Sequence, residues 1–259
     1  MSKTLSTPLI ALWVVLALGA TFTASRAADQ LPIGDCKEPR PATDLSHCDL
    51  AGANLAGLDL SGVRLDKVRL ENANLSGTKL VGVSAVGANL QWAKIADADL
   101  TDADLHDANL FHAVLDRSVL DGANLSSANL FGANLNEVRA QGADFTGAYM
   151  KDLLAEGADL SRSRFDRAFM FRGVLIGARL SDASLRQVVL TGAGLEDADF
   201  ASADLSGSLL NGAHLAGAIF HGARLKGARF PNANVAGADF SKALDIPEHL
   251  ATLLTAVKK

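Results

Sequence analysis

Aromatic residues and cysteine are both scarce in this sequence. Phe, Trp and Tyr make up 5% of the 259 residues, although 49% of the residues are hydrophobic. An interior would therefore be filled mainly by Leu and Ala, which is unusual for a globular enzyme. The only two cysteines, Cys36 and Cys48, are too far apart for a CxxC motif, which argues against a thiol redox centre.

Motifs for catalysis and for nucleotide binding are also missing. There is no glycine-rich phosphate loop and no nucleophile elbow. The histidines do not cluster with the cysteines at metal-ligand spacing; they are His47, His106, His112, His214, His221 and His249. The sequence predicts a chain that is not an enzyme and has no cofactor and no catalytic or metal site.

The first 27 residues have the layout of a secretory signal peptide. Lys3 is the only charged residue before Arg26, the run from Leu9 to Ala20 is apolar, and small residues precede a cleavage site between Ala27 and Ala28. A retained membrane anchor is the alternative, but twelve apolar residues are short for a bilayer span of ~20 residues. We therefore expect a periplasmic or secreted protein with no stable membrane span after cleavage.

In an exported chain, a close pair of cysteines favours a disulfide over a metal site. A bond between Cys36 and Cys48 would stabilise the fold by roughly 3 kcal/mol in the chain-entropy treatment. After residue 27, 29 acidic and 22 basic residues remain, a net charge of −7. This acidity disfavours binding to nucleic-acid phosphates, which requires a basic stripe.

The main feature is an apolar residue at every fifth position. From Leu45 to Phe240 forty consecutive positions follow this rule, and 27 of them are Leu. Two residues before each lies a second constrained position, which is Ala in 26 of the forty repeats. None of these eighty positions carries a charge, so we expect their side chains to point inward, where an unpaired charge is very costly.

Alternating spacings of two and three residues fit neither a helix nor a single strand. They indicate a chain that turns a corner every five residues, so that four sides close a square coil of twenty. Glycine recurs two places after the large residue, where a tight corner favours a residue without Cβ. Examples are Gly52, Gly57, Gly62, Gly122, Gly212, Gly217 and Gly222.

The repeated A(D/N)LXX pattern, as in Ala123-Asn124-Leu125 and Ala203-Asp204-Leu205, resembles the pentapeptide-repeat family over about three quarters of the chain. The resemblance implies an all-β fold, a right-handed quadrilateral parallel β-helix of about ten coils. Exported members are similar in carrying one Cys in the lead segment and another in the first CDL pentapeptide, here Cys48-Asp49-Leu50.

We expect four segments, because a solenoid needs a cover at each end. They are a signal peptide at 1–27, an N-terminal cap at 28–42, the β-helix at 43–242 and a C-terminal capping helix at 243–259. Asp245 and Pro247 suit a helix start, and Leu250, Leu253, Leu254 and Val257 would share one face. The gyrase-binding relatives suggest a dimerising helix as the alternative.

Outward apolar residues gather on two neighbouring sides of the predicted coil. The candidate interface consists of Phe111, Phe131, Tyr149, Phe169, Phe171, Val174, Ile176, Val189 and Leu209, with Val114 and Leu154 nearby. Such patches on a soluble surface usually mark an interaction site. An acidic run, Asp97, Asp99, Asp102, Asp104 and Asp107, could form a weak calcium site or simply occupy the Asp positions of the repeat.

The leading hypothesis is a non-catalytic scaffold in the periplasm that binds a protein partner, or itself, through the apolar side, and binds no nucleic acid. The alternative is an acidic mimic of DNA that inhibits a nucleic-acid enzyme such as gyrase, as some members of the resembled family do. Here the acidity is modest and is interrupted by Arg117, Arg139, Arg162 and Arg179.

Overall fold

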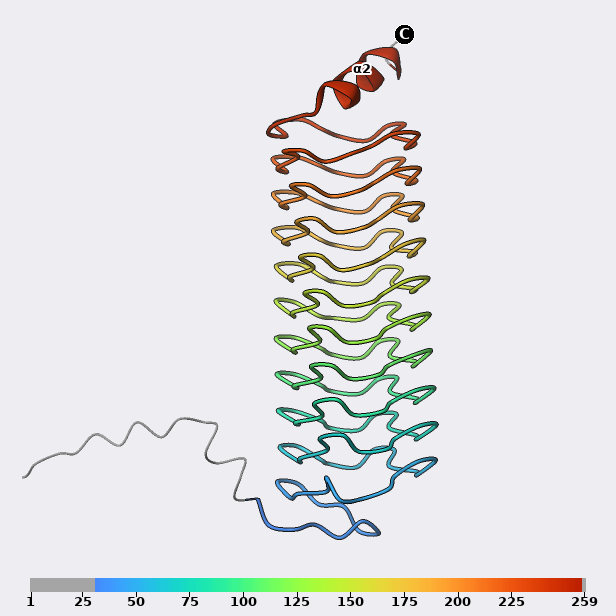
Figure 1. Ribbon diagram of the computed structural model, residues 1–259, viewed down its shortest axis with the longest axis vertical. Coiled ribbons are helices and arrows are strands. Elements are labelled where there is room, and N and C mark those ends of the chain that lie inside the picture. Colours follow the sequence, from blue (N-terminus) through green and yellow to red (C-terminus); the bar gives the residue numbers. More distant parts are fainter. Residues whose placement is uncertain (1–30, 258–259) are drawn as a thin grey trace, which may run out of the picture. The chain divides into compact units, whose positions relative to one another are not determined.

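Residues 31–257 are described by the computed structural model, and they form a stack of similar coils followed by one helix (Figure 1). Within this range the only helix is α2, Glu248–Val257, and no run of residues is long enough to be a named strand. Instead, one residue in every five forms a parallel bridge with the residue twenty positions later, from Asp44–Arg64 to Arg224–Leu244. The chain is thus a β-helix with twenty residues to a coil.

Backbone hydrogen bonds follow the same period. The Leu110 N–H donates to the carbonyl of Asn129 in the next coil (2.7 Å), and the Asn109 N–H donates to the carbonyl of Ala88 in the preceding coil (2.9 Å). The Ala113 N–H donates to the Leu110 carbonyl (2.9 Å) and closes the corner. Because this pattern recurs in each pentapeptide, most backbone groups of a coil are satisfied by its two neighbours.

The second corner residue has a positive φ in every repeat from Gly52 to Lys242. The glycines predicted at this position confirm the expectation, with Gly52 at +68° and Gly122 at +68° as examples. Other residue types also adopt it, including Trp92 at +58° and Gln187 at +57°. Left-handed backbone costs a non-glycine residue ~1–2 kcal/mol, so the hydrogen bonds between coils must offset that cost at many corners.

The interior matches the predicted pair of inward positions. All forty large positions from Leu45 to Phe240 are buried. The small positions are buried too, except for five in the end coils: Thr43, Ala53, Leu58, Ala233 and Ala238. Leu58 corrects the prediction most clearly, since 37% of it is exposed. It lies in the first coil, where no earlier coil packs against it.

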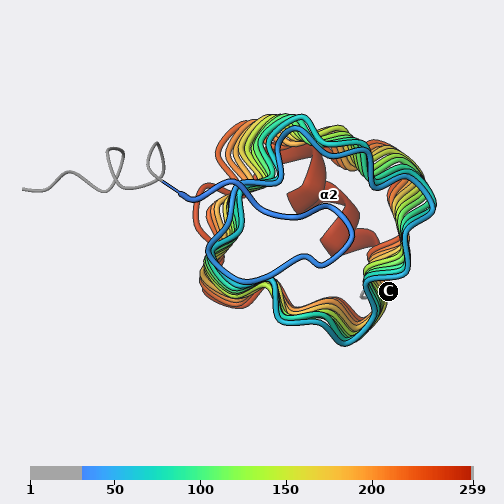
Figure 2. The same cartoon turned by 90° about the horizontal axis from the view of Figure 1, so that it is seen from below.

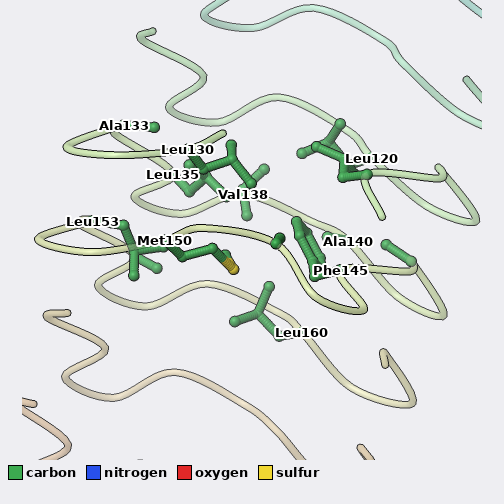
Figure 3. Packing of buried hydrophobic residues seen from close by; sticks show 14 of the residues in the cluster. Leu120, Leu130, Ala133, Leu135, Val138, Ala140, Phe145, Met150, Leu153 and Leu160 are labelled. Carbon is green, nitrogen blue, oxygen red and sulfur yellow. The ribbon is translucent and has the colours of Figure 1, made fainter. Parts of the chain in front are cut away.

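In three repeats the inward position that usually carries a large side chain is Ala, and the other inward position then carries a larger residue instead. Val83 accompanies Ala85, Val138 accompanies Ala140, and Leu153 accompanies Ala155, all of them buried. Figure 3 shows Val138, Ala140 and Leu153 among the buried side chains of successive coils. Gly173 follows Leu153 by twenty residues, and a Cβ there would lie 2.7 Å from Leu153 Cδ2. The interior therefore stays filled although three large side chains are missing.

Both ends of the stack are covered. At the N-terminus, the segment drawn in blue in Figure 2 crosses the cross-section of the coil, and Ile33 forms a parallel bridge with Asp44. A Cβ on Gly34 would lie 2.6 Å from Leu45 Cδ2, so this segment packs closely on the first coil.

At the C-terminus, α2 lies across the last coil (Figures 1 and 2). Leu250 is fully buried and Leu254 packs against the core. The His249 Nε2 accepts a hydrogen bond from the Phe230 N–H (3.0 Å). The expectations for the side chains of Leu253 and Val257 lie outside what the structure describes.

The predicted signal peptide, residues 1–27, also lies outside the described residues. Among residues 31–257, no helix has the length and apolar character needed to cross a membrane. The expectation of export therefore remains a prediction from the sequence.

Candidate protein-interaction surface

Outward side chains twenty residues apart lie next to one another in the stack, because each coil closes after twenty residues. Parallel bridges link Asn129 to Tyr149, Tyr149 to Phe169 and Phe169 to Val189. The Trp92 N–H likewise donates to the Phe111 carbonyl (2.9 Å). When residues of one chemical type recur every twenty positions, their side chains therefore form a row along the stack.

Seven rings form a continuous row that we call the aromatic ladder. Its members are Trp92, Phe111, His112, Phe131, Tyr149, Phe169 and Phe171. At one end, Trp92 stacks on His112 with ring centroids 4.3 Å apart and a 9° angle between the planes. Both rings also make T-shaped contacts with Phe111, with ring centroids 5.7 and 4.4 Å apart.

The middle of the ladder is a series of near-parallel stacks. The ring centroids of Phe111 and Phe131 are 5.3 Å apart, those of Phe131 and Tyr149 6.1 Å, and those of Tyr149 and Phe169 5.5 Å. Phe169 then stacks on Phe171 at 6.1 Å. Phe131 and Tyr149 thus each have a ring from the preceding coil on one side and a ring from the following coil on the other.

The ladder is open to solvent although its rings are large. Trp92 is 51% exposed and Tyr149 is 41% exposed, while Phe111, Phe131, Phe169 and Phe171 are half-buried. Contiguous exposed aromatic surface is uncommon on soluble proteins unless a partner covers it.

Aliphatic side chains extend this surface in the direction of the C-terminus. Val189 and Leu209 continue the row of Phe169 through successive bridges, and both are half-buried. On the adjoining side, Val174 and Ile176 both lie 3.9 Å from the position of a Cβ on Gly194, and Ile176 is 40% exposed. Ring contacts and bridges thus connect seven of the nine predicted interface residues, and Val174 and Ile176 lie on the adjoining side. Their role as an interface stays a prediction.

Sequence reasoning missed Trp92 and His112 as members of the ladder. Both occupy the second corner position, which was interpreted as a place for glycine. They are twenty residues apart, so the period could have paired them with each other. That corner residues point toward the row of Phe111 could be learned only from the coil geometry.

Cations line the ladder at the coil that contains Lys151. The Lys151 Nζ lies 5.5 Å from the ring centroid of Phe131 and 6.0 Å from that of Phe171. The Arg172 guanidinium is 5.4 Å from Phe171, and it makes two hydrogen bonds to Asp152, at 2.7 and 2.9 Å. Cations in such positions add cation–π attraction to the ring stack.

Asparagines support the first part of the ladder from the side. The Asn109 side-chain oxygen accepts a hydrogen bond from the Phe111 N–H (3.3 Å), and Asn129 does the same for Phe131 (3.2 Å). The Asn129 Nδ2 donates in turn to Asn109 Oδ1 (3.1 Å). These bonds fix the corners from which the rings project.

Many charged side chains on the coil surface form ion pairs with residues of a neighbouring coil. Eight Arg–Asp pairs have a separation of eighteen or twenty residues: Arg64–Asp44, Arg69–Asp49, Arg117–Asp97, Arg139–Asp121, Arg164–Asp144, Arg172–Asp152, Arg179–Asp159 and Arg186–Asp166. An exposed pair contributes little stability on its own, but together the pairs neutralise many of the acidic groups.

Asp159 is the most perturbed of these acids. It is 7% exposed, and burial by itself would raise its pKa. Hydrogen bonds from Ser161, Gln141 and Arg179 outweigh burial and lower the pKa of Asp159 to about 2. The Gln141 Nε2 and an Arg179 nitrogen each lie 2.6 Å from Asp159 Oδ2.

We expect Asp159→Asn to lower the free energy of unfolding at pH 7 by about 2 kcal/mol, the equivalent of a pKa lowered from 3.8 to about 2. A depressed pKa stabilises the fold above pH 4, and this contribution disappears as the pH falls toward 2. The variant should therefore lose less stability than the parent between pH 4 and pH 2, as measured by urea unfolding. Asp182→Asn, at an exposed residue, is the control; an equal effect of both changes would contradict the prediction.

The two cysteines lie at the N-terminal end of the stack. Cys36 and Cys48 are joined by a disulfide bond, with their Cα atoms 5.6 Å apart. His47 Nε2 is 3.5 Å from Cys36 Sγ, and among residues 31–257 these three form the one group of possible metal ligands within 4.8 Å of one another. Because the sulfur atoms are bonded to each other, they are not available as thiolate ligands.

The acidic run is not gathered into one site. Its carboxylates have separate neighbours: Asp97 binds Arg117, Asp99 accepts from Thr101, Asp104 accepts from Asn124, and Asp107 lies 3.2 Å from His106 Nε2. This arrangement favours the interpretation that these residues are the Asp positions of the repeat.

A family profile described as pentapeptide repeats matches the chain in 8 copies, at residues 43–82, 86–122, 108–147, 174–207 and 208–244. Among solved structures, HetL, a pentapeptide-repeat protein involved in the regulation of heterocyst differentiation in the cyanobacterium Nostoc sp. strain PCC 7120, is 29% identical. The TM-score is 0.55, and the match covers 74% of this chain and 85% of HetL.

QnrB1, a plasmid-mediated fluoroquinolone resistance protein, is 19% identical with a TM-score of 0.51 over 77% of this chain and 94% of QnrB1, so the likeness shows the fold alone. No curated protein matches the chain. The similar structures imply a right-handed coil, and proteins of this type are in general non-enzymatic structural or interaction proteins. On the profile match and the twenty-residue coil, the chain belongs to the pentapeptide-repeat family.

Proposed function

We propose that this protein is a non-catalytic scaffold, exported to the periplasm, that binds a protein partner or a second copy of itself through the aromatic ladder. The observation that supports the proposal most is the contiguity of exposed rings from Trp92 to Phe171. Aromatic side chains bury large areas on binding and are enriched at the centres of protein interfaces.

The ladder is suited to binding because it is already ordered. The central rings Phe131 and Tyr149 are each held between rings of neighbouring coils, and the corners beneath Phe111 and Phe131 are fixed by Asn109 and Asn129. Little side-chain entropy remains to be lost when a partner packs against such a surface.

Export rests on the sequence of residues 1–27, and the disulfide at the start of the coil is consistent with an oxidising compartment. We propose the domain boundaries in the same terms. Residues 28–42 form a cap, residues 43–242 a right-handed quadrilateral β-helix of about ten coils, and residues 243–259 a C-terminal capping segment that contains α2, Glu248–Val257.

The test is a triple variant, Phe131→Ser, Phe169→Ser and Phe171→Ser. We expect it to abolish self-association measured by light scattering or to abolish capture of a partner from periplasmic extract. A matched control replaces three outward apolar residues that are not in the ladder, Val119, Ile219 and Leu244, by Ser. If neither binding readout changes in the ladder variant, or if the control loses binding equally, the ladder is not the interface.

Inhibition of a nucleic-acid enzyme by mimicry of DNA is less well supported. Eight aspartates are neutralised by arginines of neighbouring coils, which interrupts any dense acidic surface. A gyrase supercoiling assay with the purified mature protein tests this alternative; inhibition at equimolar protein would favour it over the scaffold.

A further inference from the structure

A basic groove lies on a different side of the coil from the aromatic ladder. It is open, has a volume of about 770 Å³, and runs along one corner from Thr146 to Gly227. Four basic side chains line it, Arg164, Arg167, Arg186 and Lys226, against one acidic side chain, Asp166. A net positive groove is notable because the chain as a whole is acidic.

Glycine opens the C-terminal half of this groove. The second corner position carries Arg167 and Gln187 in two successive coils and then Gly207 and Gly227, with φ of +71° and +70°. A Cβ on Gly227 would meet only the backbone of Gly207, at 4.0 Å. The row of corner side chains therefore stops, and the backbone becomes accessible beside Lys226.

Two of the four cations are available for a ligand. Arg186 makes two hydrogen bonds to Asp166 Oδ2 (3.0 and 2.6 Å), and Arg164 pairs with Asp144 at 3.3 Å. Arg167 and Lys226 are exposed and form no ion pair with any residue in 31–257. An anion in the groove could pair with both without breaking an existing contact.

Two backbone donors at Lys226 and Gly227 also lack partners among the described residues. One coil earlier, the Ser206 N–H donates to Asp204 Oδ1 (3.0 Å) and the Gly207 N–H to the Lys226 carbonyl (2.8 Å). At the next corner Arg224 stands in place of the aspartate, so its side chain cannot accept. The last bridge of the coil is Arg224–Leu244, and the Gly227 N–H makes no hydrogen bond to Ile246, which would be its partner by the pattern of Gly207 and Lys226.

The spacing of these groups favours an extended ligand. The corners of Arg167 and Lys226 are three coils apart, a distance of ~14 Å at ~4.8 Å per coil. Side chains that project from the coil in parallel hold their charges about this far apart, and carboxylates on alternate residues of an extended peptide, which recur every ~6.6 Å, span that distance. A long nucleic acid is disfavoured, because the net charge of −7 after residue 27 would repel it beyond the groove.

We propose that the basic groove binds an extended acidic segment of a partner polypeptide. Arg167 and Lys226 pair with two of its carboxylates, and the free N–H groups of Lys226 and Gly227 donate to one carboxylate or carbonyl oxygen. This site is independent of the aromatic ladder, so the protein would hold two partner surfaces on different sides.

The probe is a fluorescein-labelled octa-glutamate peptide, followed by fluorescence anisotropy with the mature protein at low ionic strength. We expect saturable binding that Arg167→Gln combined with Lys226→Gln weakens by about tenfold or more. The control, Lys79→Gln combined with Lys94→Gln, removes the same charge elsewhere and should change affinity by less than about twofold. The ladder triple variant should bind the probe as the parent does.

Three results would overturn the proposal. The first is no binding of octa-glutamate, and the second is equal weakening by the control pair, which would indicate diffuse attraction. The third is tighter binding of a labelled single-stranded oligonucleotide of the same charge, which would identify the groove as a site for phosphates rather than for a peptide. Circular dichroism of each variant confirms that the coil is intact.

Discussion

One alanine inserted after Asn124 should lower the free energy of unfolding by about 4 kcal/mol or more. Asn124 lies between the inward residues Ala123 and Leu125, and it bridges Asp104 and Asp144 in the neighbouring coils. An extra residue here either turns Leu125 outward or breaks both bridges. Loss of one buried Leu alone costs 2–5 kcal/mol, and chemical denaturation followed by circular dichroism measures the total.

The matched control for this insertion is a complete coil. A second copy of residues 106–125 placed after Leu125 preserves every inward position and every bridge, so stability should be unchanged or higher, since stacked repeats add nearest-neighbour contacts. If the single-residue insertion unfolds at the same denaturant concentration as the parent, inward and outward positions are not set by a period of five.

Ala133→Asp should have an effect of similar size for a different reason. Ala133 is fully buried at a small inward position (Figure 3), and the surrounding positions carry no charge that could pair with a carboxylate. Burial of an unpaired charge is among the most destabilising single changes in proteins. We expect a loss of about 4 kcal/mol at pH 7 by urea unfolding, with partial recovery at pH 4, where the carboxyl group can be protonated.

Asn134→Asp introduces the same side chain one residue later, where it faces outward. The Asn134 Oδ1 accepts a hydrogen bond from the Asn136 N–H (3.0 Å), and a carboxylate can accept the same bond. We expect a change within about 0.5 kcal/mol. Equal destabilisation by the two changes would contradict the assignment of adjacent residues to the inside and the outside.

Which residues point inward could be predicted from the sequence, because the large position is buried in every repeat from Leu45 to Phe240. Two positions in every five carry no charged residue, because in each coil a charge at these positions would be buried at a high cost in free energy. The prediction failed at Leu58, because the repeat describes a residue between two coils and the first coil has a neighbour on one side only.

The contacts of the aromatic ladder could be predicted only in part. The spacing of Phe111 and Phe131 indicates that they are neighbours, since both are first corner residues of successive coils. How Trp92 stacks on His112 depends on the direction of a side chain at a corner with positive φ. The repeat pattern gives no information about this direction, because many of the equivalent corner positions are glycine and have no side chain.

The basic groove could not be predicted from the repeat at all. Arg167 and Lys226 are 59 residues apart and occupy different corner positions. Their relation follows from the twenty-residue coil, and the opening between them follows from Gly207 and Gly227, which look like ordinary corner glycines in the sequence. An opening that forms because side chains are absent from successive corners can be recognised only when the coils are stacked.

The fold and both proposed surfaces require that twenty residues form one coil of constant cross-section. Small-angle X-ray scattering of a variant with three added copies of residues 106–125 tests this coil geometry most directly. The coil geometry predicts an increase of about 14 Å in maximum dimension with an unchanged cross-sectional radius of gyration. A thicker particle with little or no gain in length would contradict it.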